Sequence, residues 1–467
     1  MLAPPAHRLL RCLIALLLVS VGTLVAPRAA SAHNTFVSSE PSDGASLSSA
    51  PAQISMIFGS AVPLDTATVQ AIDATGARTE AAALAHGPAG ETEVVAQLSS
   101  ALAAGDVTVR WRLVGPDGHP LTGRIAFTVA APIASTARVT VGAATTSTPT
   151  TSGAPPPAVT SPGDGGGAAG ESSVPSLVRW LLRYVSYLAI MTLVGIVLTG
   201  ALIWPGIAEL PMLRRVQTRA LATVAGTAVL QLIVLASDIS GDAPWASLDA
   251  LDRAGQTPAG TALLLRALVL VPCAAVLLHR REPGPPDIRW SLLGLTGMGL
   301  LATWSFAGHS ASQRWPQLGV PLDVVHHAAA ALWIGALAIV GFGALRRLPH
   351  DDLATVVPAL GRRAATAVTA IVLTGIVQSV RLVAYPTDVL RGAHGRLLVG
   401  KVVGLAAMLV IANANRRRVA LTFGRSGRDR PVTIEHLRRA MVVEFGLGLV
   451  VIALTAAMVV SPPATSL

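Results

Sequence analysis

Eight apolar runs constrain the fold of this 467-residue chain more than any other feature of its sequence. A helix needs about 20 apolar residues to cross the hydrocarbon core of a bilayer, and each run approaches or exceeds that length. The runs are Leu177–Trp204, Thr218–Ala236, Gly260–His279, Trp290–Ala307, Leu322–Leu345, Ala364–Ala384, Leu397–Asn415 and Ala440–Val460. We therefore expect residues 177–463 to form a polytopic α-helical membrane domain, a bundle of eight helices.

The composition and the placement of charge also indicate a membrane-spanning chain. Charged residues make up 13% of the sequence, whereas soluble proteins contain about 25%. Arginines gather in alternate loops, which the positive-inside rule assigns to the cytoplasm. These are Arg214, Arg215, Arg280, Arg281, Arg346, Arg347, Arg362, Arg363, Arg416, Arg417, Arg418, Arg425, Arg428 and Arg430, against Arg253, Arg314 and Arg391 in the opposite loops. The topology explains the net charge of +10 without a nucleic-acid partner. It predicts a multi-pass protein of the cytoplasmic membrane with its C-terminus outside.

Residues 1–32 have the pattern of a secretory signal peptide. A basic start precedes an apolar run at 13–25, and Ala30 and Ala32 occupy the positions that signal peptidase reads. Cleavage after Ala32 would make His33 the first residue of the mature chain and would place the following segment outside the cell membrane.

Residues 33–131 have the pattern of an all-β domain. Short runs rich in β-branched and aromatic residues are separated by Gly, Pro and Asp turn signals. The predicted strands are Ile54–Phe58, Ala67–Ile72, Glu93–Leu98, Val107–Leu113 and Arg124–Val129. We expect a Greek-key β-sandwich of the cupredoxin or immunoglobulin type. Residues 132–176, rich in Ala, Thr, Ser, Pro and Gly, form a flexible linker in this prediction because they cannot bury a core.

A histidine at the mature N-terminus has its α-amine and its ring nitrogen on one residue, so His33 can chelate a metal ion. These nitrogen ligands suit Cu(II). Asp117 and His119 are two residues apart, a spacing at which side chains of an extended chain point the same way. Cys12 falls in the signal peptide and Cys273 in a predicted span. The exported segment therefore has no thiolate ligand and must use nitrogen, oxygen or thioether ligands.

The exported segment resembles the copper-resistance protein C (CopC) family along its whole length. The matching residues are His33-Asn34-Thr35-Phe36, Ser39-Glu40-Pro41-Ser42-Asp43-Gly44-Ala45, Ala50-Pro51, Trp111-Arg112, Asp117-Gly118-His119-Pro120, Gly123 and Phe127-Thr128-Val129. The resemblance implies a Cu(II) site made by the amine and ring of His33 together with His119 and Asp117. Met56 is the only methionine between His33 and the linker. We expect it to fill the core, so no thioether site for Cu(I) is expected.

Four histidines of the membrane segment lie near helix ends that the topology places outside. His309 follows the fourth run, His326 and His327 fall in the first two turns of the fifth, and His394 precedes the seventh. Adjacent residues of a helix point about 100° apart, so we expect only one of His326 and His327 to face the bundle. Ionisable residues inside membrane spans usually mark function.

This segment resembles the copper-resistance protein D (CopD) family over most of 177–463. The supporting residues are Gly308-His309, the stretch from Asp323 to Gly335, Thr374-Gly375, Gly395-Arg396-Leu397-Leu398-Val399-Gly400-Lys401, Asn413-Ala414-Asn415-Arg416 and Glu444. The resemblance implies copper handling across the cytoplasmic membrane. Candidate copper ligands at the outer membrane face are His309, His326, His327 and His394. Lys401 and Glu444, the latter near the inner end of the eighth run, are further polar residues that can snorkel or pair with a neighbour.

The chain is thus predicted to be a copper-binding membrane protein that captures Cu(II) outside and takes part in copper import, homeostasis or resistance. The sequence contains no complete G-x-x-x-x-G-K-[ST] loop, so transport would not be driven by nucleotide hydrolysis on this chain. We expect no enzymatic activity. One alternative is a metallochaperone that delivers copper, without transport, to a membrane oxidase or another membrane or exported protein. A further alternative is a haem-binding or Cu(II)-reducing protein, with histidines of separate helices as axial ligands.

Overall fold

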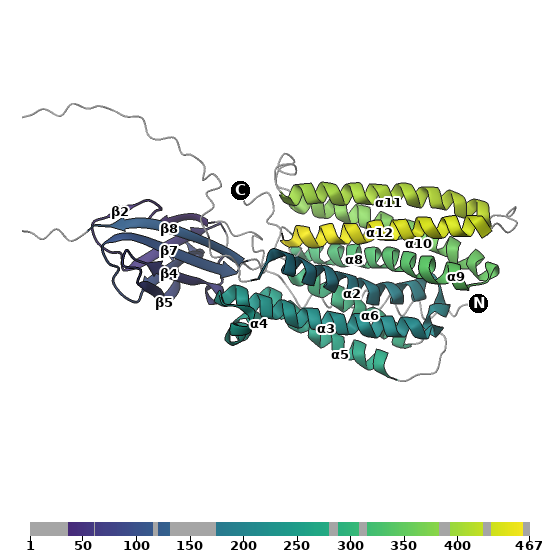
Figure 1. Ribbon diagram of the computed structural model, residues 1–467, viewed down its shortest axis with the longest axis horizontal. Helices are drawn as coiled ribbons and strands as arrows, with labels where there is room; N and C mark the ends of the chain where they lie inside the picture. Colours follow the sequence, from purple (N-terminus) through teal and green to yellow (C-terminus); the bar gives the residue numbers. More distant parts are fainter. Residues whose placement is uncertain are drawn as a thin grey trace, which may run out of the picture.

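The computed structural model describes residues 36–59, 61–114, 120–130, 174–279, 288–307, 315–382, 393–423 and 431–460. These residues form a β-domain and a helical domain that lie end to end (Figure 1). The predicted signal peptide, His33 and nearly all of the predicted linker lie outside the described residues.

The described part of the β-domain is one sheet of eight strands. The strands are β1 Phe36–Glu40, β2 Ser46–Leu47, β3 Gln53–Phe58, β4 Thr68–Ile72, β5 Arg78–Gly87, β6 Gly90–Leu98, β7 Gly105–Val114 and β8 Pro120–Val129. Their order across the sheet is β1-β3-β6-β5-β4-β7-β8-β2, and all neighbours are antiparallel except β2 and β8. The all-β prediction is confirmed. Instead of two separate sheets, however, a single sheet continues through β5, which bonds to both β6 and β4.

The two halves of this sheet share one core. Side chains of β3 and β6 (Ile54, Met56, Phe58, Val94, Ala96) join those of β4, β7 and β8 (Val69, Val109, Trp111, Ile125, Phe127) in a single buried cluster. The alternation predicted for β7 is present, since Val107, Val109, Trp111 and Leu113 are all buried. Met56 is only 1% exposed and fills the core as predicted.

Eight helices of the described chain have 20 residues or more. They are α2 Ser176–Leu202, α3 Pro211–Ser240, α5 Pro258–Leu278, α6 Ile288–Ala307, α8 Pro316–Ala338, α10 His350–Leu382, α11 Ala393–Phe423 and α12 Pro431–Val460. Within the described residues, seven helices are long and apolar enough to cross a membrane, and α6 is not among them. Its Gly, Ser and Thr residues dilute its apolar side chains. Seven of the eight predicted spans therefore correspond to candidate membrane helices, and the count of eight spans stays a prediction.

Several helices extend well beyond the predicted spans. α8 begins at Pro316 rather than Leu322, and α12 begins at Pro431 rather than Ala440. Shorter elements connect the long helices: the 3-10 turns η1 Leu64–Thr66, η2 Pro205–Glu209, η3 Pro244–Ala246 and η4 Leu248–Ala250, the helix α4 Leu251–Gln256, the π-helical turn η5 Ile339–Ala344 and the helical turn α9 Leu345–Arg347.

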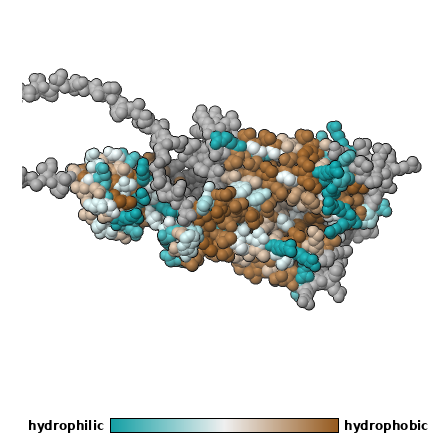
Figure 2. Space-filling model, in the orientation of Figure 1, coloured by the Kyte–Doolittle hydropathy of each residue, from teal (hydrophilic) through white to brown (hydrophobic). Residues whose placement is uncertain are grey.

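The helix α8 lies at the centre of the bundle. It packs against α2, α6, α10 and α12. The face of the helical domain shown in Figure 2 is mostly hydrophobic, with hydrophilic residues gathered toward its ends. A hydrophobic surface of this kind matches the hydrocarbon core of a bilayer. Because α8 is surrounded by other helices, its polar side chains lie inside protein rather than in lipid.

Candidate functional site

The structure describes the side chains of two of the seven predicted copper ligands. His33, Asp117, His119 and His309 lie outside the described residues, and of His394 only the backbone is described, in the first turn of α11. His326 and His327 both lie on α8. The structure therefore describes only the residues that flank the predicted site of His33, Asp117 and His119, whereas it describes the side chains of His326 and His327 themselves.

The described residues that flank the exported ligands meet at one part of the β-domain. His33 is three residues before Phe36, whose ring stacks on Trp111 with centroids 5.6 Å apart and an interplanar angle of 24°. Trp111 precedes Val114, the last described residue before the segment with Asp117 and His119. Val114 pairs with Pro120, the first described residue after it. Three extended residues span at most about 11 Å, so this geometry is compatible with one ion held by His33, Asp117 and His119.

Two local features fix these flanks. Gly123 lies opposite Trp111 in the β7–β8 pair, and a Cβ at this position would collide with the indole ring. A glycine is therefore required for the indole to lie across β8. The hydroxyl of Thr66 donates to the carbonyl of Val114 at 3.0 Å and accepts from its N–H at 3.3 Å, which holds the end of β7.

Both described membrane histidines are held in one tautomer. His327 Nδ1 lies 2.8 Å from the carbonyl oxygen of Asp323, which can only accept, so Nδ1 carries the hydrogen. His326 Nδ1 lies 2.8 Å from the hydroxyl of Thr374 on α10. That hydroxyl already donates to the carbonyl of Ala370 at 2.5 Å, so it accepts from His326. In both rings Nε2 is then left with a free lone pair, the form in which imidazole binds a metal.

The expectation that only one of these histidines faces the bundle is wrong. His326 points to α10, where it also approaches Gly375. His327 points in a different direction, with its ring centroid 5.5 Å from that of Trp304 on α6 and 6.4 Å from that of Tyr187 on α2. The 100° separation is real, but α8 is surrounded by helices, so both directions lead into protein. The two ring centroids are 5.9 Å apart.

The two histidines also lie deeper than predicted. Because α8 begins at Pro316, they are ten and eleven residues into the helix, about 15 Å from its start along the axis. The sequence places the start of the apolar run at Leu322, because the preceding turn is more polar.

A carboxylate completes the polar group on α8. Asp323 Oδ2 accepts from the hydroxyl of Ser305 on α6 at 2.8 Å, and Asp323 Oδ1 lies 3.6 Å from His327 Nδ1. Lys401 of α11 is close enough to act electrostatically on both Asp323 and His326. Within the described residues no three His, Cys, Asp or Glu side chains are grouped closely enough to hold a metal ion. His326, His327 and Asp323 are thus at most part of a binding site.

A second buried polar group lies farther along α8. Trp333 Nε1 donates to Glu444 Oε1 at 2.9 Å, and Asn415 Nδ2 donates to Glu444 Oε2 at 3.4 Å. Glu444 is 2% exposed and sits thirteen residues into α12, not near its inner end as predicted, because this helix begins at Pro431. The motif around Trp333 and the isolated Asn415 and Glu444 were visible in the sequence, but their contact was not.

Comparison with known proteins identifies both halves. The CopC domain family model matches residues 36–130. The model of the copper resistance protein D-like N-terminal domain matches 174–315, and that of copper resistance protein D matches 354–458. The chain is a CopC–CopD fusion. Copper resistance protein D of Pseudomonas syringae pv. tomato is 29% identical over 298 residues, covering 59% of the fusion and 93% of that protein. Copper transport protein CutJ of Bacillus subtilis (strain 168) is 23% identical over 448 residues, covering 94% and 75%.

Solved structures similar to the fusion match its N-terminal part. CopC from Methylosinus trichosporium OB3b is 24% identical, covers 21% of the fusion and 94% of its own chain, and has a TM-score of 0.19. PcoC, a methionine-rich copper resistance protein from Escherichia coli, is 27% identical, covers 21% and 99%, and has a TM-score of 0.19. The family matches, together with the seven candidate spans, make the fusion a copper-related, multi-pass membrane protein.

Proposed function

We propose that the CopC–CopD fusion captures Cu(II) outside the cytoplasmic membrane with His33, Asp117 and His119 and admits copper into its helical domain at His326 and His327. The observation that carries the proposal is the pair of interior imidazoles on the central helix, each with the hydrogen on Nδ1 and the lone pair on Nε2, in a chain that also has a CopC domain. Polar groups inside a membrane bundle are costly, so their retention on α8 favours a role in ion passage.

The proposed orientation follows from the distribution of charge. Arg214 and Arg215 lie in the first turns of α3, and Arg346 and Arg347 follow the π-helical turn after α8. α3 ends, and α8 begins, toward the β-domain (Figure 1). These arginines are therefore at the opposite end, which the positive-inside rule makes cytoplasmic. The β-domain and the end of α12 are then outside.

The proposed inward route follows α8. His326 and Trp333 are seven residues apart, so they lie on one side of the helix and about 10 Å apart along its axis. Asp323 near the histidines and Glu444 beside Trp333 place a carboxylate at each of these levels. A carboxylate offsets part of the cost of a cation in a low-dielectric interior. In this proposal the fusion is a carrier and not an enzyme.

Copper uptake into proteoliposomes tests the proposal. Vesicles containing the fusion and an entrapped copper-sensitive chelator are exposed to Cu(II), or to Cu(I) in a parallel arm. We expect uptake above that of protein-free vesicles, reduced in His326→Ala and His327→Ala by at least the roughly 10- to 100-fold that the loss of a residue orienting a metal ligand costs. His279→Ala, an exposed histidine at the end of α5, is the matched control.

The outcomes separate the alternatives. Copper bound by the protein but absent from the vesicle interior contradicts import and favours the metallochaperone. A Soret band in the visible spectrum of the purified protein contradicts the copper carrier and favours haem binding. Equal loss of uptake in His279→Ala and His326→Ala contradicts the assignment of the α8 histidines.

A further inference from the structure

The β-domain touches the helical domain through the end of β7, which lies against α3, and through η1, which lies against α4. The side chain of Val114 is fully buried in a cluster with Leu235, Ala236 and Ile239 of α3, Ala250 of η4 and Ala254 of α4. Among the described residues of the β-domain, Val114 alone belongs to this cluster. The contact therefore holds the last described residue before the segment that carries Asp117 and His119.

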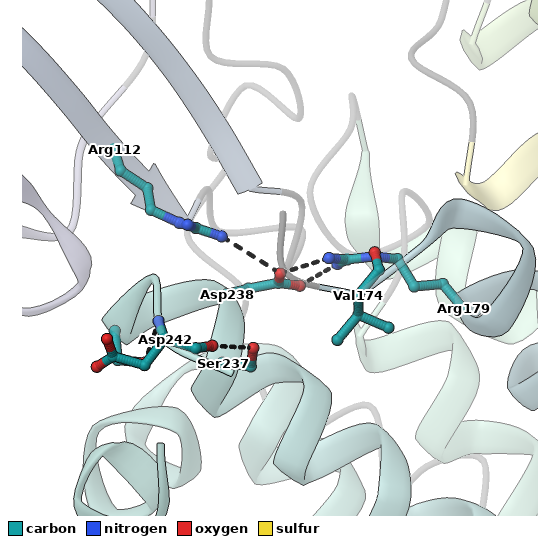
Figure 3. Close-up of polar contacts among 7 residues, drawn as sticks. Arg112, Val174, Arg179, Ser237, Asp238 and Asp242 are labelled. Atoms are coloured by element: carbon teal, nitrogen blue, oxygen red, sulfur yellow. Dashed lines mark hydrogen bonds and ion pairs between the residues drawn. The ribbon is translucent and has the colours of Figure 1, made fainter. Parts of the chain in front are cut away.

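A carboxylate at the end of α3 joins three elements beside this contact (Figure 3). Asp238 is 2% exposed and forms a two-point ion pair with Arg179 of α2, in which Arg179 Nη2 donates to Asp238 Oδ1 at 2.6 Å. Arg112 of β7 approaches the same Oδ1 with Nη2 at 3.5 Å. The helix α3 ends at Gly241, whose φ of 85° favours glycine. Gly241 also lies beside Arg112, since a Cβ built there would be 3.4 Å from Arg112 Nη1, an ordinary contact distance.

The charges at this junction explain why the two domains meet in one orientation. Apolar contacts such as that of Val114 are non-directional, so they select an orientation less sharply than charged hydrogen-bonding groups do. A guanidinium and a carboxylate select one sharply, because their hydrogen bonds require a fixed geometry. Burial lowers the pKa of Arg112, while the carboxylates of Asp238 and Asp242 act in the opposite sense. An Arg112 moved away from Asp238 would leave this buried carboxylate with one partner fewer, which opposes undocking.

We propose that Arg112 and Asp238 form a docking latch that holds the β-domain on α3, so that the copper-capturing segment stays at the outer end of the helical domain. The latch makes Arg112 a positioning residue: it binds no copper but limits where copper is released. The chain length sets this limit, since Asp117 is three residues from the docked Val114 and so within about 11 Å of it. The copper part of this inference rests on the proposed function, whereas the docking does not.

A spin-label distance measurement on the full-length protein in nanodiscs tests the docking. Labels are attached at Ala82→Cys on the exposed side of β5 and at Trp245→Cys, which is 81% exposed beside the junction, after Cys12 and Cys273 are changed to alanine. We expect one narrow distance distribution, broadened in Arg112→Gln and largely restored in Arg112→Lys. Arg110→Gln is the matched control, because Arg110 is exposed and lies two residues away on the same side of β7. A broad distribution in the unmodified protein, or equal broadening in both Gln variants, overturns the latch.

Copper measurements then separate positioning from capture. In Arg112→Gln we expect the Cu(II) affinity of the full chain to stay within twofold while the initial rate of uptake falls about tenfold. Broadened distances with unchanged uptake overturn the positioning role. If the unmodified protein binds copper but moves none, the proposed import fails, and the spin-label distances still decide the docking. Arg179→Gln is not used as a substitute because Arg179 also holds α2 on α3.

Discussion

Replacing Phe36 by alanine is expected to weaken Cu(II) binding although residue 36 carries no ligand atom. The ring of Phe36 stacks on Trp111 and meets Phe58 edge-on with centroids 6.0 Å apart, and the residue is 37% exposed. Phe36 pairs with Phe58 but the register of the β1–β3 pair is interrupted between Phe36 and Ser38, so the ring adds an anchor at the start of β1 beyond its backbone pairing. His33 is three residues away, so the position of Phe36 limits where His33 can lie when the ion binds.

The expected loss of Cu(II) affinity in Phe36→Ala depends on how many residues the substitution releases. Without its ring, residue 36 and the neighbouring Val37 must be ordered when His33 binds copper, at about 1–2 kcal/mol for each residue. Since 1.4 kcal/mol is a factor of ten, the release of one residue weakens the affinity about tenfold and the release of two by more.

The assay is a competition titration of the full-length protein with a Cu(II) chelator, followed by the visible absorption of bound Cu(II). Val37→Ala is the control, because the neighbouring Val37 is 61% exposed. Phe36→Leu keeps apolar contact with Trp111 and is expected to lose less affinity than Phe36→Ala. An unchanged dissociation constant in Phe36→Ala, with the β-domain still folded by circular dichroism, would refute the reasoning.

Three further predictions concern stability and transport. Met56→Ala is expected to destabilise the β-domain by about 2–5 kcal/mol, because Met56 lies in the core, and urea unfolding measures this. The hydroxyl of Ser55 and the N–H of Ala89 hold the pKa of Glu93 below its ordinary value of 4.5; the stability this gives is present above pH 4.5 and lost at lower pH, so Ser55→Ala should flatten the pH dependence of unfolding. Glu444→Gln keeps the shape of the side chain but removes its charge, and uptake into proteoliposomes is expected to fall while Cu(II) binding at the β-domain is unchanged.

Strong periodicity made most of the β-domain predictable, and its absence explains what was missed. Val107, Val109 and Trp111 alternate with polar residues and read as a half-buried strand. The strand β5 Arg78–Gly87 contains four alanines, a residue depleted in strands, and it forms because β6 and β4 pair with it on both edges. The short β2 is likewise defined by its partner, β8.

In the helical domain, too, some features are predictable from the sequence and others are not. Hydropathy indicates which residues can lie in lipid but not where a helix ends. The sequence therefore predicts a loop for the arginine-rich stretch after Asn415. In the structure α11 continues through Arg416 and Arg417 to Phe423. Arginine is a good helix former, and a helix that leaves the membrane has no reason to stop at the last apolar residue.

The candidate sites depended on contacts between distant parts of the chain. The histidines on α8 were found from sequence because ionisable residues are rare in apolar runs, but their surroundings depend on α8 lying among four other helices. No sequence pattern identifies Asp238, because its partners, Arg179 and Arg112, are 59 and 126 residues away.

The placement of these groups argues for a directed path rather than a set of separate sites. The junction of Arg112 and Asp238 lies at the end of α3 nearest the β-domain, the imidazoles of His326 and His327 lie about three turns into α8, and Glu444 meets Trp333 about two turns farther on. A protein that only stored copper outside would need, of these groups, the junction of Arg112 and Asp238. A chaperone that docked on its own membrane domain would use this junction and the imidazoles of His326 and His327. A buried carboxylate beside Trp333 has a use mainly if a cation goes deeper, so the effect of Glu444→Gln on uptake discriminates most directly between delivery and import.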